Sequence, residues 1–420
     1  MTDARAGPGS AAILAGCAAV LPLLAEWAPL GLAPLLAVAG IAVLAVDGRA
    51  ALAAARHLAP CAVLFGALAL WAAVSAAWSI LPLYSFVSAL RLVGVGAGGL
   101  VVFGAAMALA PERRRLVGAA LLGGLAAAIA VALIERATDG AITRFLIAPA
   151  RVSLVRFDRG ATTLALALWP MVAAIAPGRR AVLPIAVALA GVVAIFLLDS
   201  DAASLAVVVG IAVFAVAWAA PRLAAAALAA GLVLAAIALP LATPDDPAVV
   251  AIHHAAPWIK YSGIHRLMIW RFTADRIAER PLLGWGMGAS RDLPGGKTDL
   301  TTLFPDAGLM PGSEALPLHP HSAVLQWEVE LGVPGTLAAL AFVCWSLWRV
   351  GTSAGMSRLH RAASLAWAAA AMVIALLAYG IWQSWWLSCL WLTAALFAAI
   401  TVPAAETPRD SVRIRARDQP

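Results

Sequence analysis

Two histidines and the arginines that precede them are the side chains of this sequence best suited to chemistry. His319 and His321 stand in a His-Pro-His-Ser run immediately before a long apolar stretch. An unperturbed imidazole titrates close to neutral pH, so a histidine at such a boundary can remove a proton from a hydroxyl group. The alternative is a helix-capping or interfacial pair. A metal site is disfavoured, because no third ligand stands at a useful spacing from the two histidines.

The arginines lie upstream in a polar segment, residues 242–321, whose most regular part begins at Ser262. On an ideal helix its apolar positions form one stripe, which contains Gly263, Leu267, Trp270, Ala274 and Ile277. Arg271 lies to one side of the stripe and Arg266 on the opposite flank. A guanidinium placed there can hold a phosphate by paired, charge-assisted hydrogen bonds. The pattern predicts a helix at a membrane surface that ends before Pro281, although ion pairs with nearby acidic residues are an alternative role for most of these arginines.

Four further charged residues are candidates of lesser weight. Arg156 and Arg159 stand just before another apolar stretch. Arg91 interrupts an apolar stretch, and an ionisable group at such a depth is a functional candidate by default, unless its side chain snorkels to the surface. Glu330, in the apolar stretch after the histidines, is a candidate supporting residue, as is Arg271.

These candidates belong to a chain with the composition of a membrane protein. Of its 420 residues, 63% are hydrophobic and 12% are charged, far outside the range of an ordinary soluble domain. A spanning helix needs roughly 20 mostly apolar residues, and the sequence predicts an all-α, polytopic fold with about 12 such spans. The candidate stretches are residues 11–24, 29–46, 58–78, 83–109, 116–134, 161–176, 181–198, 202–219, 223–241, 322–348, 362–379 and 381–402.

Loop charge orients these stretches, because short cytoplasmic loops carry an excess of Lys and Arg. With the N-terminus in the cytoplasm, every second connection carries arginines, and so does the C-terminal tail. Two longer connections then lie on the opposite face. This distribution also accounts for the net charge of +7 without invoking nucleic acid. We predict four parts: an N-terminal bundle of about nine spans over 1–241 with an outer loop at 135–160, a large outer segment at 242–321 with short amphipathic helices, C-terminal helices at 322–403, and a basic cytoplasmic tail at 404–420.

The residues between 262 and 335 resemble one known family. The motif begins with Arg266, Leu267 and Trp270, continues through the Pro-Leu-Leu-Gly-Trp-Gly run that starts at Pro281, and includes both histidines. Its remaining members are Leu325, Gln326, Glu330, Gly332 and Gly335. The pattern is similar to that of the O-antigen ligase and polymerase superfamily. Elsewhere in the chain the resemblance rests on hydropathy and span count.

The resemblance implies an inverting, metal-independent glycosyltransferase that needs no cofactor and works at the periplasmic face of a bacterial inner membrane. The implied donor is a glycan carried on undecaprenyl diphosphate, and the acceptor is lipid A core or another glycan. In that family arginines bind the donor diphosphate and a histidine activates the acceptor hydroxyl. By motif position these roles fall to Arg266 and His321, with His319 as the fallback.

One departure from the family pattern concerns a second arginine. Where the family often has a Ser-Arg pair after a span, this chain reads Leu-Asp-Ser-Asp-Ala, with Ser200 followed by Asp201. Arg156 or Arg159 can supply the missing cation; otherwise the chain is a divergent or inactive relative.

Three other functions stay open at this point. A polymerase of the same superfamily differs from a ligase in its acceptor. A secondary transporter would suit the polytopic topology, but transporters place their polar site near the bilayer midplane and often show two related halves. A structural partner in envelope synthesis becomes the better reading if Asp201 has abolished catalysis.

Overall fold

The computed structural model describes residues 5–146, 157–175 and 181–400, and these residues form α-helices joined by turns, without a named strand. The predicted all-α, polytopic fold is confirmed. Arg156 and the basic tail lie outside the described residues, and so does part of the loop at 135–160.

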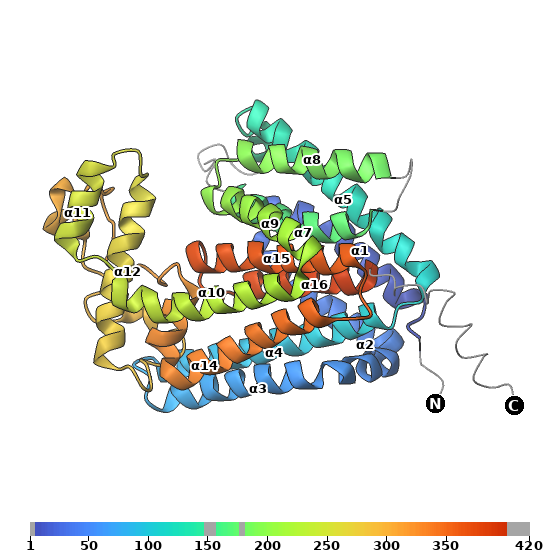
Figure 1. The fold of residues 1–420 in the computed structure, drawn as a ribbon, viewed down its shortest axis with the longest axis horizontal. Coiled ribbons are helices and arrows are strands. Elements are labelled where there is room, and N and C mark those ends of the chain that lie inside the picture. The colour runs from blue at the N-terminus through green and yellow to red at the C-terminus, as the bar shows by residue number, and fades with distance from the viewer. Residues whose placement is uncertain (1–4, 147–156, 176–180, 401–420) are drawn as a thin grey trace, which may run out of the picture.

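Long helices make up the bundle, and each predicted apolar stretch overlaps one of them (Figure 1). They are α1 (Pro8–Trp27), α2 (Leu32–Ala55), α3 (Ala59–Val74), α4 (Pro82–Met107), α5 (Pro111–Ala137), α7 (Asp158–Ala173), α8 (Val182–Leu197), α9 (Asp201–Ala219), α10 (Pro221–Ala242), α14 (Ala323–Thr352), α15 (Arg358–Leu377) and α16 (Ser384–Ile400). Within the described residues, 8 helical stretches are long and apolar enough to cross a membrane, and one of them, Pro29–Ala77, contains both α2 and α3. The number of spans stays a prediction.

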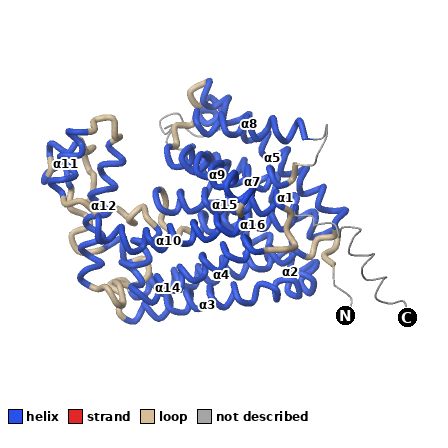
Figure 2. The backbone as a smooth tube through the Cα atoms, viewed as in Figure 1, coloured by secondary structure: helices blue, strands red, loops and turns tan. Residues whose placement is uncertain are grey.

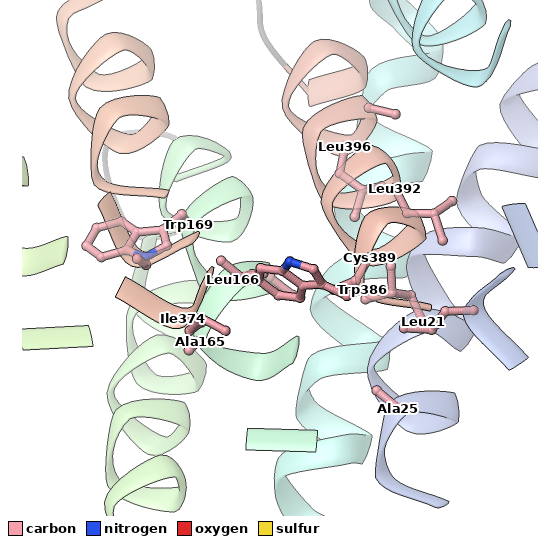
Figure 3. Packing of buried hydrophobic residues seen from close by; sticks show 14 of the residues in the cluster. Leu21, Ala25, Ala165, Leu166, Trp169, Ile374, Trp386, Cys389, Leu392 and Leu396 are labelled. Carbon is pink, nitrogen blue, oxygen red and sulfur yellow. The ribbon is translucent and has the colours of Figure 1, made fainter. Parts of the chain in front are cut away.

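Small residues let these helices approach closely, as is common where apolar helices pack inside a membrane. A Cβ atom added to Gly104 of α4 would lie 2.3 Å from the Ala51 carbonyl oxygen of α2, and one on Gly124 of α5 would lie 2.5 Å from the Ala19 carbonyl oxygen of α1. Trp386 of α16 is fully buried where α1, α7, α15 and α16 meet (Figure 3). The centre of the bundle therefore joins helices from both ends of the sequence.

The bundle has two ends of different character. One, the arginine end, contains Arg114, whose guanidinium donates to the Ala398 carbonyl at 2.7 Å, together with Arg222 and Arg361, which line one pocket. The other, the histidine end, contains the histidine pair, the start of α7 and the start of α16. Most of the residues between α10 and α14 lie at this end, with α11 (Asp246–Ala255) and α12 (Tyr261–Glu279) projecting beyond the long helices (Figures 1 and 2).

Helix α12 confirms the predicted helix before Pro281, but its buried face differs from the predicted stripe. The side chains that are buried include Ile264, Met268 and Ile269, whereas Gly263 and Leu267 are half-exposed. The reason is that two groups of residues cover the helix on neighbouring flanks. Ile264 and Met268 pack with residues of α11 and α13 (Leu300–Leu303). Ile269 packs with apolar residues of the segment that follows α12, among them Trp285, and with Val329 of α14.

A kink in α14 joins the large outer segment to the bundle. Gly332 has φ 60° and ψ −163°, and Pro334 has no N–H to donate, so carbonyl groups before the kink lose their helical partners. Those groups are satisfied by other parts of the chain: Val329 and Glu330 accept from the backbone of Trp285 and Gly286, each at 2.8 Å. Irregular backbone among apolar helices is tolerated where protein groups satisfy it in this way.

Candidate active site

His321 lies in a strained turn that fixes the orientation of its ring. The turn leads into α14, whose N-cap is Ser322, and His321 itself has φ 55°, a conformation that non-glycine residues rarely adopt. Its Nδ1 lies 2.5 Å from the carbonyl oxygen of Ala378, in the connection between α15 and α16. A carbonyl oxygen can only accept, so Nδ1 carries the proton. In the neutral ring, Nε2 therefore keeps a free lone pair and can accept a proton.

His319 stacks beside His321, with 4.3 Å between ring centroids. Its Nε2 lies 3.3 Å from the side-chain nitrogen of Gln383, and its Nδ1 lies 3.3 Å from the backbone nitrogen of His321. A neutral imidazole has a single acceptor nitrogen, so at most one of these contacts is a true hydrogen bond. The Gln383 contact is the better defined, because Trp385 donates to the Gln383 oxygen at 2.7 Å and so turns the amide nitrogen toward His319.

Both histidines are held neutral at pH 7. Burial, together with the charges of Arg266 and His265, lowers the pKa of His321 from 6.5 to about 4, although the Ala378 carbonyl and Asp158 act in the opposite direction. Burial, with His321 and Arg291, lowers the pKa of His319 to about 3. A neutral imidazole with a free Nε2 is the protonation state that a general base requires.

Three arginines near the histidines have no ion-pair partner among the described residues. Arg266 acts electrostatically on His321, and Arg291 acts on His319 while its guanidinium lies 4.1 Å from the centre of the Tyr84 ring. Arg159 lies 5.4 Å from the centre of the Trp385 ring. By contrast, Arg271 forms an ion pair with Asp275 at 2.8 Å. Unpaired guanidinium groups beside a base can bind an anionic substrate group.

A pocket beside Arg159 includes one residue that contacts His319. It has a volume of about 320 Å³ and is lined by Leu30, Ala33, Arg159, Gln383, Ser384 and Trp385. Gln383 thus both lines the pocket and contacts His319. Leu30 is 64% exposed at the pocket edge. The pocket therefore presents a cation and an amide next to an exposed apolar surface.

Asp158 is the acidic centre of the same region. Its carboxylate accepts from the Tyr379 hydroxyl and, at 2.5 Å, from the Ser200 hydroxyl. The neighbouring Asp201, where the family often has arginine, pairs with Lys260 at 2.7 Å, and both side chains are 61% exposed. This departure therefore brings a solvent-exposed ion pair rather than a cation to the start of α9.

Glu330 is fully buried and ties together the segments that frame the site. One carboxylate oxygen accepts from the Gly288 N–H at 2.6 Å and from Trp382 Nε1 at 2.7 Å, and the other accepts from the Gln326 amide at 3.0 Å. Gln326 in turn accepts from the Ile381 N–H at 2.9 Å. Glu330 thus links α14 to the glycine-rich turn (residues 284–288) and to the connection just before α16.

The structure does not bring every sequence candidate to the site. Arg91 is exposed on α4 beside Leu90, which is also exposed, and it has no hydrogen bond or ion pair with a described residue. Arg271 is held by Asp275, as the ion-pair alternative expected. Within the described ranges, no three His, Cys, Asp or Glu side chains are grouped as metal ligands.

Four site residues were not found by reasoning from the sequence: Asp158, Arg291, Tyr379 and Gln383. Weak signals existed for two of them, because Asp158 adjoins Arg159 and Gln383 is a polar residue at the start of an apolar stretch. Nothing in the sequence indicates that Tyr379 meets Asp158, since 221 positions separate them.

The fold and this site define a multi-pass helical membrane protein with a polar site at one end of its bundle. In a comparison with known families, residues 185–340 match the O-antigen ligase family model. The match covers α8 to the middle of α14, including the large outer segment and the histidine turn. The match supports the resemblance to the O-antigen ligase superfamily seen in the sequence.

Relatives named "putative polysaccharide ligase" agree with this resemblance. The protein of Rickettsia conorii is 27% identical over 281 residues, which cover 66% of each chain, and that of Rickettsia typhi is 28% identical over 276 residues, 65% of each. The protein of Rickettsia bellii is 26% identical over 321 residues, 76% of this chain and 75% of the relative. The first two alignments thus span just under two thirds of the relatives' length.

Proposed function

We propose that this protein is an inverting, metal-independent glycosyltransferase of the O-antigen ligase type. It transfers a glycan from undecaprenyl diphosphate to lipid A core or another glycan, at the periplasmic face of a bacterial inner membrane. The observation that carries the proposal is the free Nε2 of His321 within electrostatic range of Arg266, an arginine without an ion-pair partner among the described residues. This arrangement offers a base and an anion-binding group at one place.

The proposed reaction is a single displacement. The acceptor hydroxyl gives its proton to Nε2 of His321 as its oxygen forms a bond to the anomeric carbon of the donor sugar. The bond from that carbon to the diphosphate oxygen breaks, and undecaprenyl diphosphate leaves with the electron pair. Arg266, with Arg159 and Arg291, stabilises the charge that develops on the leaving group, so no metal is needed. Attack opposite the leaving group inverts the anomeric centre.

The pocket beside Arg159 suits the donor lipid. A diphosphate at Arg159 and Gln383 would lie next to His319, and the attached polyprenyl chain could leave over the exposed Leu30 at the pocket edge. The polyprenyl chain would then contact an apolar surface, and the diphosphate would contact the guanidinium of Arg159 and the amide of Gln383. Confinement of the donor in the membrane beside the base also reduces the entropic cost of bringing the reactants together.

Two observations weigh against the other functions. The histidine pair precedes α14 and lies outside the stretches that are apolar and long enough to span a membrane, whereas a transporter site is expected near the midplane. Asp201 stands where the family often has a second arginine, but the site still contains two other cations, Arg159 and Arg291. We therefore favour an active enzyme over a structural partner.

Substitution of His321 tests the proposed base. Asparagine tolerates positive φ and can donate to the Ala378 carbonyl, but it cannot accept the acceptor proton. His321→Asn and His321→Ala should both bind donor lipid nearly as well as the parent while transfer falls by roughly 100- to 10,000-fold. Full transfer by the Asn variant would reject the base assignment. A strong loss in His319→Ala, with little loss at His321, would move the role to His319.

The acceptor is tested by deleting the gene and analysing the surface glycans. Loss of attachment with normal chain length indicates a ligase, and attached single repeats indicate a polymerase. Restoration by the parent gene, but not by the His321→Asn gene, ties the phenotype to the site. Unchanged glycans after deletion would contradict the proposal.

A further inference from the structure

The connection between α15 and α16 does more than separate two helices, because it holds the ring of His321. The Ala378 carbonyl accepts from His321 Nδ1 at 2.5 Å. The next residue, Tyr379, is 8% exposed, and its hydroxyl donates to the carboxylate of Asp158 at the start of α7. Since the Ala378 carbonyl belongs to the peptide that joins Ala378 to Tyr379, an anchor on Tyr379 also fixes the direction of that carbonyl.

Both ends of the Tyr379–Asp158 contact are themselves held in place. The Tyr379 ring packs edge-on against Trp385 at 4.7 Å between centroids and lies 5.9 Å from Trp386. Asp158 accepts a second hydrogen bond, from the buried Ser200 that caps α9. Helices α7, α9 and α16 therefore converge on the group that orients the His321 ring.

The charge of Asp158 also acts on His321. Of the groups facing the ring, Arg266 and His265 from α12 lower its pKa, His319 lies beside it as a neutral ring, and Asp158 from α7 raises the pKa. Arg159, next to Asp158, acts on Tyr379 rather than on the ring. The Asp158 carboxylate therefore acts together with the Ala378 carbonyl to favour the imidazolium form, which burial and the nearby cations oppose.

We propose that Asp158 is a positioning residue for His321. Through Tyr379 it fixes the Ala378 carbonyl that keeps the proton on Nδ1 and leaves Nε2 free, and its charge stabilises the imidazolium that forms when Nε2 takes the acceptor proton. The imidazolium then returns that proton to solvent. The inference rests on the proposed function for the identity of the proton donor, but the orientation of the ring can be measured without any substrate.

Two substitutions separate the contact from the charge. Tyr379→Phe keeps the aromatic packing and the carboxylate but removes the hydroxyl that joins them. Asp158→Asn keeps an oxygen that can accept from Tyr379 but removes the charge. Thr162→Val is the matched control, because Thr162 provides the other hydroxyl within reach of Tyr379, at 3.1 Å, and carries no charge.

Nitrogen NMR of histidine-labelled protein in lipid nanodiscs reports the tautomer and the titration midpoint of His321, assigned by loss of its signal in His321→Asn. The parent should show the Nδ1–H tautomer at pH 7. Tyr379→Phe should show a mixture of tautomers, and Asp158→Asn should keep the parent tautomer with a midpoint lower by roughly half a pH unit. Thr162→Val should match the parent.

Transfer measured on the same proteins should fall by roughly 10- to 100-fold in Tyr379→Phe, as when a group that orients a functional imidazole is lost, with KM for the donor unchanged. An Nε2–H tautomer in the parent overturns the inference even if no variant folds. So do parent-like signals in both test variants. Absence of transfer by the parent, with the NMR results as expected, would instead reject the proposed function and leave the positioning role standing.

Discussion

At the residue level, the site separates arginines that bind partners within the protein from arginines that do not. Arg271 and Arg276 of α12 pair with Asp275 and Glu279, each at 2.8 Å. Arg266, on the same helix, has no such partner among the described residues and acts on His321 instead. Helix α12 thus contains Arg271, which is held in an ion pair, and Arg266, which is available to a ligand.

This pair makes a direct comparison possible. Arg266→Lys keeps the charge but loses the planar guanidinium that can bind two phosphate oxygens at once. Most of the transfer activity should therefore be lost. Arg271→Lys keeps an exposed ion pair of small worth and should stay close to the parent in activity and abundance. Transfer by purified protein with a lipid-diphosphate donor measures both. Full activity of Arg266→Ala at normal abundance would contradict the assignment.

The pH dependence of transfer tests the state of His321. A base acts when unprotonated, so kcat/KM should rise with pH through about 4, the pKa of His321 in the free protein, and level off above it. A bound diphosphate offsets the charge of Arg266 that helps to lower this pKa. The acid limb of kcat should therefore lie at higher pH than that of kcat/KM, and Arg266→Gln should raise the limb of kcat/KM. A kcat limb at lower pH would reject this coupling.

The parts of the site that sequence could supply are those with a local signal. Residue type and spacing mark His319, His321 and Arg266 as candidates. In the structure the two histidine rings lie 4.3 Å apart, and Arg266 lies within electrostatic range of His321. The hydrogen bond between Asp158 and Tyr379 has no such signal, because it depends on how α7 packs against the connection between α15 and α16. Packing of distant helices is a tertiary property that periodicity does not encode.

At the level of elements, the kink of α14 is the feature on which the site most depends. A Cβ atom on Gly332 would lie 2.2 Å from the Leu282 carbonyl oxygen, and its φ of 60° with ψ of −163° is a conformation open essentially to glycine alone. The glycine-rich turn packs against this kink, and Glu330 joins the two. Displacement of either one would move the start of α16 and the groups around His319.

Substitution at the kink should therefore be costly. Gly332→Ala should destabilise the protein by about 1–3 kcal/mol from backbone strain alone, and more if the Leu282 carbonyl cannot move. Gly231→Ala in α10 is the control, because a Cβ there meets no atom within 4 Å and alanine is the better helix former. Thermal unfolding in detergent measures both. Equal stability of the two variants would show that the kink tolerates a side chain.

Element positions were the most predictable part of the fold, since long apolar runs dictate membrane helices almost by themselves. The end of α12 before Pro281 was also predicted correctly, from the proline and glycines that follow. Its buried face matches the predicted stripe only in part, because Ala274 is buried whereas Gly263 and Leu267 are half-exposed. The loop residues of the outer segment cover it from two flanks.

At the level of the whole molecule, the two ends differ in how their charges are satisfied. Every ion pair between described residues involves a cation from residues 135–160 or 242–321, at the histidine end: Arg144–Asp139, Lys260–Asp201, Arg271–Asp275, Arg276–Glu279 and Lys297–Glu314. These five cations are neutralised by their acidic partners, whereas Arg159, Arg266 and Arg291 have no ion-pair partner among the described residues. The positive-inside rule counts short loops, of up to about 60 residues, and the longer segment 242–321 falls outside it. The arginines of the short connections can then determine which end of the bundle faces the cytoplasm.

Reporter fusions test that orientation directly. Fusions after Gly140 and after Pro294 should lie in the periplasm, because both positions belong to the segments at the histidine end. Fusions after Arg114, Arg180 and Arg417 should lie in the cytoplasm, because an excess of Lys and Arg retains short loops on that side. A paired periplasmic and cytoplasmic reporter at each position controls for expression. A cytoplasmic signal after Pro294 would put Arg266 and His321 in the compartment that the proposed donor glycan does not face, and would overturn the orientation and the proposed reaction together.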